Sequence, residues 1–269
     1  KKFICCNRYY LKFPKRNLMT LILSKTPFRM SFVGGGSDLQ SYYKKKGGAV
    51  LSTTINKFMY IAAKYSFENE FILHYSKTEK VNNINKIQHP LIRETLKELK
   101  ISAPMQISSL ADIPGSGTGL GSSSSFVVGL ANAVSSLNQK NMTNNDLAEF
   151  ACKIEIDKCN EPIGKQDQFA ASFGGFNVIE FNPDNSVSVI PLNINKDLKS
   201  IVEKNIQVFY TNKTRSTSSI LNEQKENMKN STKIKLMNRM VELVYILKKD
   251  LESGNHDSFG EILSENWSL

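Results

Sequence analysis

A glycine- and serine-rich segment that runs directly into an apolar helix constrains this chain more than any other feature. Residues 114–125 read PGSGTGLGSSSS, and apolar residues recur at helical spacing through residues 126–137. Glycines let the backbone adopt positive φ and approach a ligand without an intervening Cβ. Helix starts present unpaired N–H groups and a partial positive charge, which favour phosphate. A flexible linker is the alternative, but an ordered apolar helix does not usually follow one. We therefore predict a phosphate-binding loop.

The segment matches neither of the two common nucleotide loops. No lysine follows Gly121, so the pattern G-x-x-x-x-G-K-[ST] is absent. Ser122 and Ser123 stand where the dinucleotide fingerprint requires its last glycine. The ligand therefore has to be inferred from the rest of the chain.

An upstream segment combines a strand with a glycine turn. Residues 26–38 read TPFRMSFVGGGSD, which predicts a short strand broken by three glycines. Asp38 then lies on a loop or caps the following helix. Taken alone, Asp38 is explained as an ordinary cap and Arg29 as a surface charge.

A downstream segment carries two further carboxylates. Thr143 and Asp146 have the spacing of a capping box, which predicts a helix start. Glu155 follows beside the apolar face of that helix, where a solvated carboxylate is the ordinary explanation. Asp167 lies within GKQDQ at residues 164–168, and a helix cap is the simple alternative for it.

Together and in this order, the three segments resemble the motifs of the GHMP kinases, the family of galactokinase, homoserine kinase, mevalonate kinase and phosphomevalonate kinase. The family's second motif runs Pro, three residues, Gly-Leu-Gly-Ser-Ser, and this chain has one extra residue between Pro114 and Gly119. The resemblance covers most of residues 25–182. It implies an ATP-dependent kinase that phosphorylates an alcohol group of a sugar or another small molecule.

The resemblance also implies roles for residues of this chain. ATP is expected on the loop, with the phosphates held by backbone N–H groups. The residues expected to bind it are Pro114, Gly117, Gly119, Leu120, Gly121, Ser122, Ser123 and Ser124. Ser123 and Glu155 are expected to hold Mg²⁺, a hard ion that prefers oxygen ligands. Asp167 is expected to accept or orient the attacking hydroxyl, and Arg29 to keep it ionised, because a nearby cation lowers the pKa of a carboxylate.

The residues within the motifs indicate which substrate the chain prefers. Galactokinases carry Glu-His where this chain has Gly35 and Gly36, whereas GGGSD, GGAVLSTTINK at residues 47–57 and GKQDQ are most similar to the heptose-phosphate kinases. That similarity implies phosphorylation of the anomeric hydroxyl of D-glycero-D-manno-heptose 7-phosphate, for nucleotide-activated heptose synthesis. A fucokinase-like sugar-1-kinase and a catalytically impaired sugar-binding relic stay open as alternatives.

Substrate contacts follow from the same similarity. The residues expected to contact the sugar are Gly35, Gly36, Ser37 and Asp38. A sugar phosphate also requires a cation at its far end. Arg215 is the candidate, because a guanidinium binds phosphate with a bidentate fork, and Lys213 is the second choice. A surface loop cation is the alternative explanation of Arg215.

The implied fold is α+β with two domains. The family's N-terminal domain contains a left-handed β-α-β crossover, rare by the usual handedness rule, and its C-terminal domain is ferredoxin-like. We predict the first domain at residues 19–192 and the second at 193–269. The second is expected to be truncated, because the family's glycine-rich third motif is not found. Residues 1–18 hold six basic residues and no acidic one, and are expected to lie outside the fold.

Composition fits a soluble enzyme of the cytoplasm, and the resemblance implies a small-molecule substrate. The chain is 40% hydrophobic and no apolar run approaches the roughly 18 residues of a membrane span. Its four cysteines form neither a disulfide framework nor a zinc motif. The net charge of +10 arises mostly in the basic tail, which argues against the alternative of RNA binding. We expect no nucleic-acid or membrane partner, and a homodimer is left open.

The remaining elements are predicted from periodicity and turn residues. Strands are expected at 21–34, 49–66 and 105–110, a hairpin at 174–181 and 186–192, helices after Asp38, at 91–99 and at 216–252, and a loop at 76–89. Residues 206–211 are expected to begin a second unit.

Overall fold

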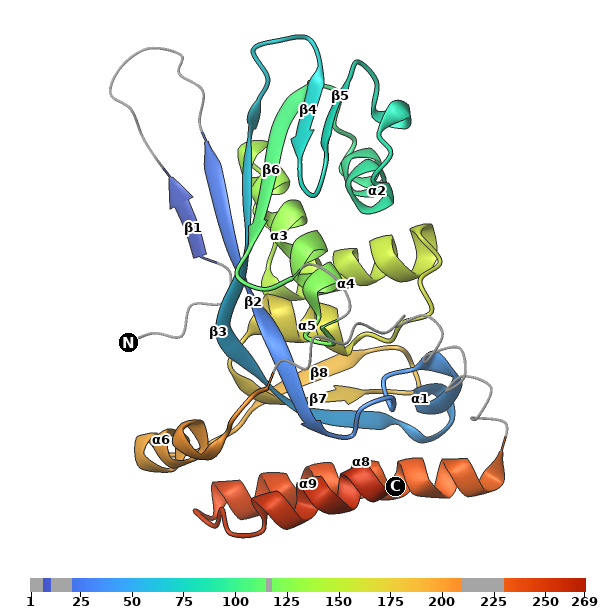
Figure 1. Cartoon of the computed structure of the whole chain (residues 1–269). Coiled ribbons are helices and arrows are strands. Elements are labelled where there is room, and N and C mark those ends of the chain that lie inside the picture. Colours follow the sequence, from blue (N-terminus) through green and yellow to red (C-terminus); the bar gives the residue numbers. More distant parts are fainter. Residues whose placement is uncertain (1–6, 11–20, 115–117, 210–229) are drawn as a thin grey trace. The chain divides into compact units, whose positions relative to one another are not determined.

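The computed structural model describes residues 7–10, 21–114, 118–209 and 230–269 (Figure 1), and the chain divides into two compact units. Unit 1 contains the described residues up to Arg29, with Thr54–Glu161 and Asp167–Gly174. Unit 2 contains Met30–Thr53, Pro162–Gln166 and the described residues from Gly175 onward. The expected boundary between residues 192 and 193 falls inside unit 2, and that division stays a prediction.

Helices and strands alternate along the described chain. The strands are β1 (Asn7–Tyr10), β2 (Ile22–Val33), β3 (Gly48–Tyr65), β4 (Phe71–His74), β5 (Thr78–Val81), β6 (Met105–Ala111), β7 (Phe176–Phe181) and β8 (Val187–Pro191). The helices are α1 (Gln40–Lys46), α2 (Pro90–Glu98), α3 (Ser122–Leu137), α4 (Asn144–Cys152), α5 (Gln166–Phe173), α6 (Lys196–Asn205), α8 (Ser231–Glu252) and α9 (Phe259–Ser268). A 3₁₀ turn, η1 (Ile84–Lys86), and a π-helical turn, η2 (Lys153–Lys158), complete them. The predicted α+β class is confirmed.

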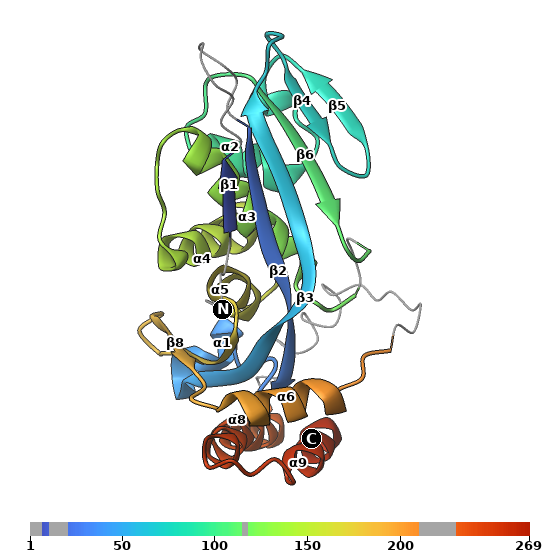
Figure 2. The ribbon, with the colours of Figure 1, turned by 90° about the vertical axis from the view of Figure 1, so that its left-hand side faces the viewer.

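Unit 1 is built on a mixed sheet with strand order β1-β2-β3-β6-β4-β5. β3 runs antiparallel to β6, with Ile61 opposite Ser109, and β4 runs parallel to β6, with Leu73 opposite Ile107. The helices α2, α3 and α4 lie on one face of this sheet (Figure 2). Ile61, Leu73 and Ile107 are buried in the core of unit 1, so alternate positions of the strands supply its apolar face.

The helix α3 is the most deeply buried element of unit 1. All its residues from Ser124 to Leu137 are buried, the serines and Asn132 included. The sequence predicted a helix with one apolar face, but this helix is enclosed on all sides. Gly129 permits the close packing, since a Cβ there would lie 2.8 Å from Thr26 Oγ1 and 3.2 Å from Ile61 Cγ1.

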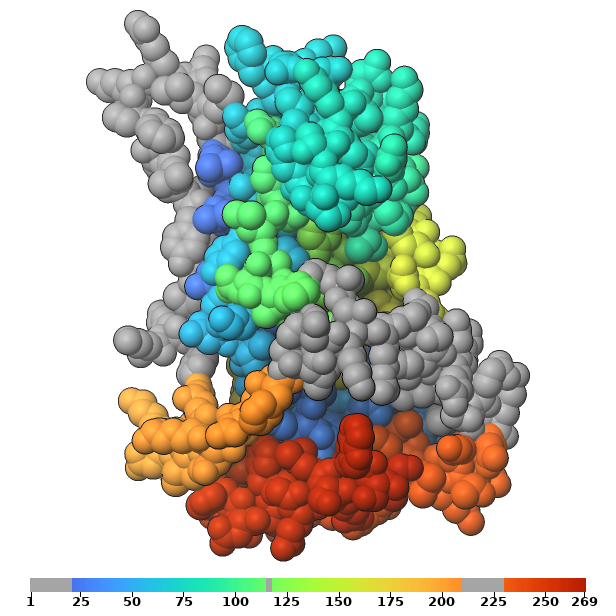
Figure 3. Space-filling view, viewed as in Figure 1, coloured from blue at the N-terminus to red at the C-terminus, as the bar shows by residue number. Residues whose placement is uncertain are grey.

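Unit 2 combines the first part of β3 with the β7–β8 hairpin and the C-terminal helices. Val50 pairs with Ile179, and Val178 pairs with Ile190, both in antiparallel register. A separate core contains Phe32, Leu51, Val178, Leu247 and Leu251. The predicted hairpin is therefore confirmed. On the face shown in Figure 3, α9 (red) forms part of the molecular surface.

Several elements differ from the sequence predictions. The expected loop at residues 76–89 contains β5 and η1, because Thr78–Val81 pairs with β4 despite its charged sequence. Neither α6 nor α9 was predicted. The last long helix was expected to start at residue 216, which lies outside the described residues. Within the described residues, α8 begins at Ser231. No helix among the described residues is long and apolar enough to cross a membrane.

Candidate active site

The glycine-serine loop leads into α3 as predicted. Gly119 and Gly121 have φ of 69° and 72°, a left-handed conformation that favours glycine. Gly121 is the N-cap of α3, with no side-chain cap hydrogen bond and no acidic residue in the first turn of this described helix. Ser122 and Ser123 form that first turn, so the positive end of the helix lacks a carboxylate of its own and suits an anion.

The other predicted loop residues are placed in part. Pro114 and Gly119 are exposed, Leu120 is half-buried and Ser124 is buried. Gly117 lies outside the described residues.

Arg29, near the middle of β2, connects this loop to Asp167. Its backbone N–H donates to Leu120 O at 3.1 Å, and its Nη1 donates to Gly119 O at 2.6 Å. Its Nε donates to Asp167 Oδ1 at 2.8 Å, and Nη2 lies 2.6 Å from the same oxygen. The structure therefore brings Arg29 and Asp167 together, as expected. The two contacts with loop carbonyls were not predicted, because backbone acceptors leave no mark in the sequence.

Asp167 lies in the first turn of α5, where a helix dipole favours a carboxylate. A Cβ on Gly121 would lie 3.2 Å from Arg29 Cγ and 3.3 Å from Asp167 Oδ2, whereas a Cβ on Gly119 would meet nothing within 4 Å. At Gly121 the loop therefore packs against the Arg29–Asp167 ion pair, whereas at Gly119 there is free space beside the backbone.

Glu155 lies in η2, the π-helical turn that follows α4, and is fully buried. It accepts hydrogen bonds from Ser123 Oγ, from Ser124 Oγ at 2.7 Å and from Gln168 Nε2 at 2.6 Å. The solvated carboxylate considered from the sequence is therefore wrong. A π-helical turn changes which side a residue faces, and such turns are frequent at functional sites.

Burial raises the pKa of Glu155 to about 7, because desolvation disfavours the charged form. The hydrogen bonds from Ser123, Ser124 and Gln168 act in the opposite direction, and the negative charge of Asp167 adds to the increase. Gln168 was missed by the sequence analysis, although it stands one residue after Asp167.

Ser123 and Glu155 suit a hard cation. Magnesium commonly takes one or two protein oxygens and completes its shell with water and phosphate oxygens. The buried carboxylate of Glu155 has three neutral hydrogen-bond donors, which a cation could supplement. Among the described residues no cluster of three or more His, Cys, Asp or Glu side chains could hold a metal by itself.

The predicted sugar residues lie in unit 2, on the turn between β2 and α1. Ser37 is fully buried, with Oγ 2.7 Å from Gly34 O and 2.9 Å from Ala49 O, so its hydroxyl shapes the turn. Gly35 is half-exposed, and a Cβ added to it would meet nothing within 4 Å, whereas Gly36 has a φ of 88°.

Asp38 closes the same turn and is only 3% exposed. Gln166 donates to both carboxylate oxygens of Asp38, from its backbone N–H to Oδ2 and from Nε2 to Oδ1, each at 3.2 Å. Arg215 and Lys213 lie outside the described residues.

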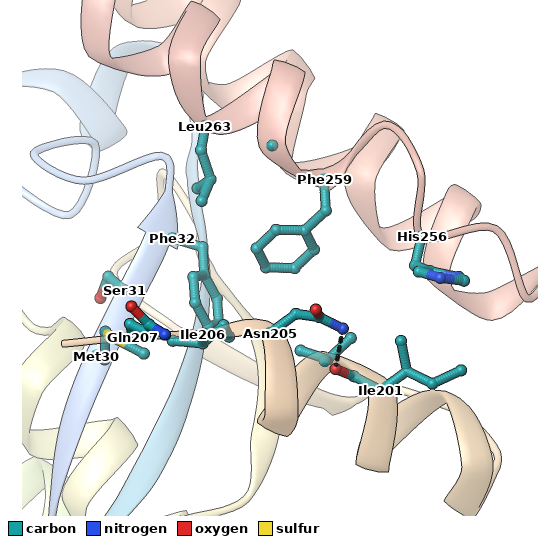
Figure 4. A pocket seen from close by; sticks show the side chains of 12 residues that line it. Met30, Ser31, Phe32, Ile201, Asn205, Ile206, Gln207, His256, Phe259 and Leu263 are labelled. Carbon is teal, nitrogen blue, oxygen red and sulfur yellow. Dashed lines mark hydrogen bonds between the residues drawn. The ribbon is translucent and has the colours of Figure 1, made fainter.

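Unit 2 also contains a pocket of about 660 Å³ between β2, α6 and α9 (Figure 4). Phe32 and Phe259 pack edge to face within it, with ring centroids 5.1 Å apart. Its lining is mainly apolar and includes none of the residues predicted to bind nucleotide or sugar. A polar, phosphorylated ligand is unsuited to such a surface.

Comparison with known proteins gives consistent relatives. Residues 84–175 match the GHMP kinases N terminal domain. A D-glycero-alpha-D-manno-heptose 7-phosphate kinase of Campylobacter jejuni is 28% identical over 265 residues, covering 93% of this chain and 77% of that protein. A homoserine kinase of Saccharolobus islandicus is 32% identical over 173 residues, covering 57% of this chain and 54% of that protein.

The fold is also similar to a solved structure. The crystal structure of a D-glycero-D-manno-heptose 1-phosphate kinase from Bacteroides thetaiotaomicron has a TM-score of 0.79 and 25% sequence identity. That similarity covers 93% of this chain and 78% of the solved chain. The matched family domain includes the loop, Glu155 and Asp167.

Proposed function

Because the chain belongs to the GHMP kinases, a family of ATP-dependent small-molecule kinases, we propose that it phosphorylates the anomeric hydroxyl of D-glycero-D-manno-heptose 7-phosphate. The product would serve the synthesis of nucleotide-activated heptose. The choice of substrate is supported by the Campylobacter jejuni relative, which aligns over 93% of this chain. We place the reaction in the cytoplasm, where ATP is the phosphoryl donor.

The observation that carries the proposal is the arginine that joins the phosphate loop to a carboxylate. Phosphoryl transfer depends mainly on positioning and on neutralising the charge of the moving group. Arg29 contacts Asp167 and Gly119 O at once, so one cation can orient both the acceptor side and the donor side of the reaction. Asp167 would accept or orient the proton of the attacking sugar hydroxyl.

The remaining nucleotide contacts follow from the loop. Backbone N–H groups of residues 119–123 would bind the ATP phosphates at the start of α3. Mg²⁺ held by Ser123 Oγ and Glu155 would supply the positive charge that these phosphates require. Ser124 and Gln168 donate to Glu155 and would keep its carboxylate pointed at that position.

The sugar would be read by the turn in unit 2. Gly35 and Gly36 allow close approach of a ligand to the backbone, Ser37 fixes the turn from within, and Asp38 would bind sugar hydroxyls. Arg215 is proposed to bind the 7-phosphate.

A substrate panel tests the proposal. Phosphorylation of heptose 7-phosphate, fucose, galactose and homoserine by ATP would be followed by ADP release, with magnesium present. We expect heptose 7-phosphate to give the highest kcat/KM. A higher value for fucose would favour the fucokinase-like alternative. Sugar binding without turnover of any substrate would instead favour the catalytically impaired relic.

A further inference from the structure

Gln166 is the centre of a hydrogen-bonded group that surrounds the buried carboxylate of Asp38. Its backbone N–H and its side-chain Nε2 each donate to a different oxygen of that carboxylate, at 3.2 Å. Two donors from one residue restrict both the position and the rotation of the group they hold. Asp38 is 3% exposed, so water has little access to its carboxylate and cannot replace the hydrogen bonds from Gln166.

The chain approaches Asp38 unusually closely at the same place. A Cβ built on Gly164 would lie 1.9 Å from Asp38 Oδ2 and 2.7 Å from Asp38 O. No other residue type could occupy this position without moving the carboxylate. Gly164 thereby brings the segment that carries Gln166 against Asp38.

Ser31 determines which way the Gln166 amide faces. Its hydroxyl donates to Gln166 Oε1 at 2.8 Å. The two ends of an amide are similar in shape but opposite in hydrogen-bonding character. A donor placed on the oxygen therefore directs the nitrogen toward Asp38. Ser31 itself lies at the edge of the apolar pocket (Figure 4). Its hydroxyl is nevertheless part of the polar group around Asp38, because it bonds to Gln166.

We propose that Gln166 is a positioning residue for substrate specificity, holding Asp38 in the orientation that binds the sugar. The inference rests on the proposed function, because it assumes that Asp38 binds sugar hydroxyls. Ser31 acts through Gln166 and has no separate effect on the sugar.

Steady-state kinetics and calorimetric binding of heptose 7-phosphate test this role in Gln166→Met, which keeps the side-chain length and removes its hydrogen bonds. We expect the Kd and KM for the sugar to rise roughly ten- to hundredfold, the usual effect of losing a hydrogen bond to a charged group, while the KM for ATP stays unchanged. Lys165→Met is the matched control, because the neighbouring side chain donates to Asn185 O and not to Asp38.

A double variant separates positioning from a general loss of structure. Ser31→Ala alone should weaken sugar binding by a smaller factor, and it should have no further effect when Gln166 is already Met, since the two residues act in series. Equal sugar affinity in the parent protein and Gln166→Met would overturn the inference alone. A parallel rise in the KM for ATP would also overturn it, by indicating a structural role. A parent protein that does not bind heptose 7-phosphate would overturn the proposed function and this inference together.

Discussion

Replacing Glu155 by glutamine should stabilise the protein at neutral pH when no metal is present. Glu155 is fully buried, and desolvation raises its pKa from 4.5 to about 7. At about 1.4 kcal/mol per pH unit, this difference corresponds to a cost of about 3 kcal/mol when the folded protein must carry the charge. Glutamine is neutral and nearly the same shape, and it can exchange hydrogen bonds with Ser123, Ser124 and Gln168.

The pH dependence gives the sign of the effect. Below pH 4.5 the carboxyl group is protonated in both the folded and the unfolded chain, so the parent protein and Glu155→Gln should differ little. Between pH 4.5 and about 7 the unfolded chain ionises first, and the contribution of Glu155 to the free energy of unfolding falls as pH rises. Above about pH 7 the loss is complete.

Urea unfolding in the presence of a chelator measures this directly. We expect the advantage of Glu155→Gln over the parent protein to grow by about 2 to 3 kcal/mol between pH 5 and pH 8. Glu149→Gln, at an exposed position on α4, is the control for removing one carboxylate without relieving burial. An advantage for Glu155→Gln that is the same at both pH values, or a loss of stability at pH 8, would refute the reasoning.

The same variant should lose the response to magnesium nucleotide. In the parent protein, adding Mg²⁺ with ADP should raise the melting temperature, because a ligand that binds only the folded state stabilises it. Glu155→Gln should show a much smaller rise, since a neutral amide is a poor ligand for a hard cation. An undiminished rise would exclude Glu155 from the proposed metal site.

Three further variants test neighbouring features. Asp167→Asn should lower kcat by about 10²- to 10⁴-fold with ATP affinity nearly unchanged, whereas Asp157→Asn, at an exposed position of η2, should leave kcat near the parent value. Gly121→Ala should reduce kcat far more than Gly119→Ala. Both substitutions place alanine at a position of positive φ, but only a Cβ at residue 121 would lie against the Asp167 carboxylate. Equal losses of kcat would contradict this. Thr143→Ala should cost about 1 kcal/mol in urea unfolding with unchanged kcat, because it removes a capping box.

The parts of the site that the sequence predicted are those carried by local patterns. The glycines at 119 and 121, the helix that follows them and the capping box at Thr143 each depend on a few consecutive residues. The approach of Arg29 to Asp167 is different, because 138 positions separate the two in the chain. It was reached through the resemblance to a family and not from the residues themselves.

The parts that the sequence could not predict depend on three-dimensional packing. Helical periodicity placed Glu155 beside an apolar face, but the π-helical turn moves the side chain into full burial. Two contacts of Arg29 end on backbone carbonyls of the loop, which every residue possesses. Gln166 and Gln168 were read only as members of a motif, and each proves to donate to a different buried carboxylate.

The two carboxylates that unit 1 contributes to the candidate site, Asp167 and Glu155, are held in contrasting ways, and the contrast matches the roles proposed for them. Asp167 is paired with the guanidinium of Arg29, which holds its carboxylate in one place and suits a group that orients a hydroxyl. Among the residues that the structure describes, the hydrogen-bond donors to Glu155 are the neutral groups of Ser123, Ser124 and Gln168. Burial disfavours the charged form of this carboxylate. A buried carboxylate without a cation is costly, and a divalent ion beside Ser123 would remove that cost. If magnesium nucleotide binds there as proposed, it would restore the stability that the protein forgoes at Glu155 without metal, and nucleotide binding would be coupled to the stability of unit 1.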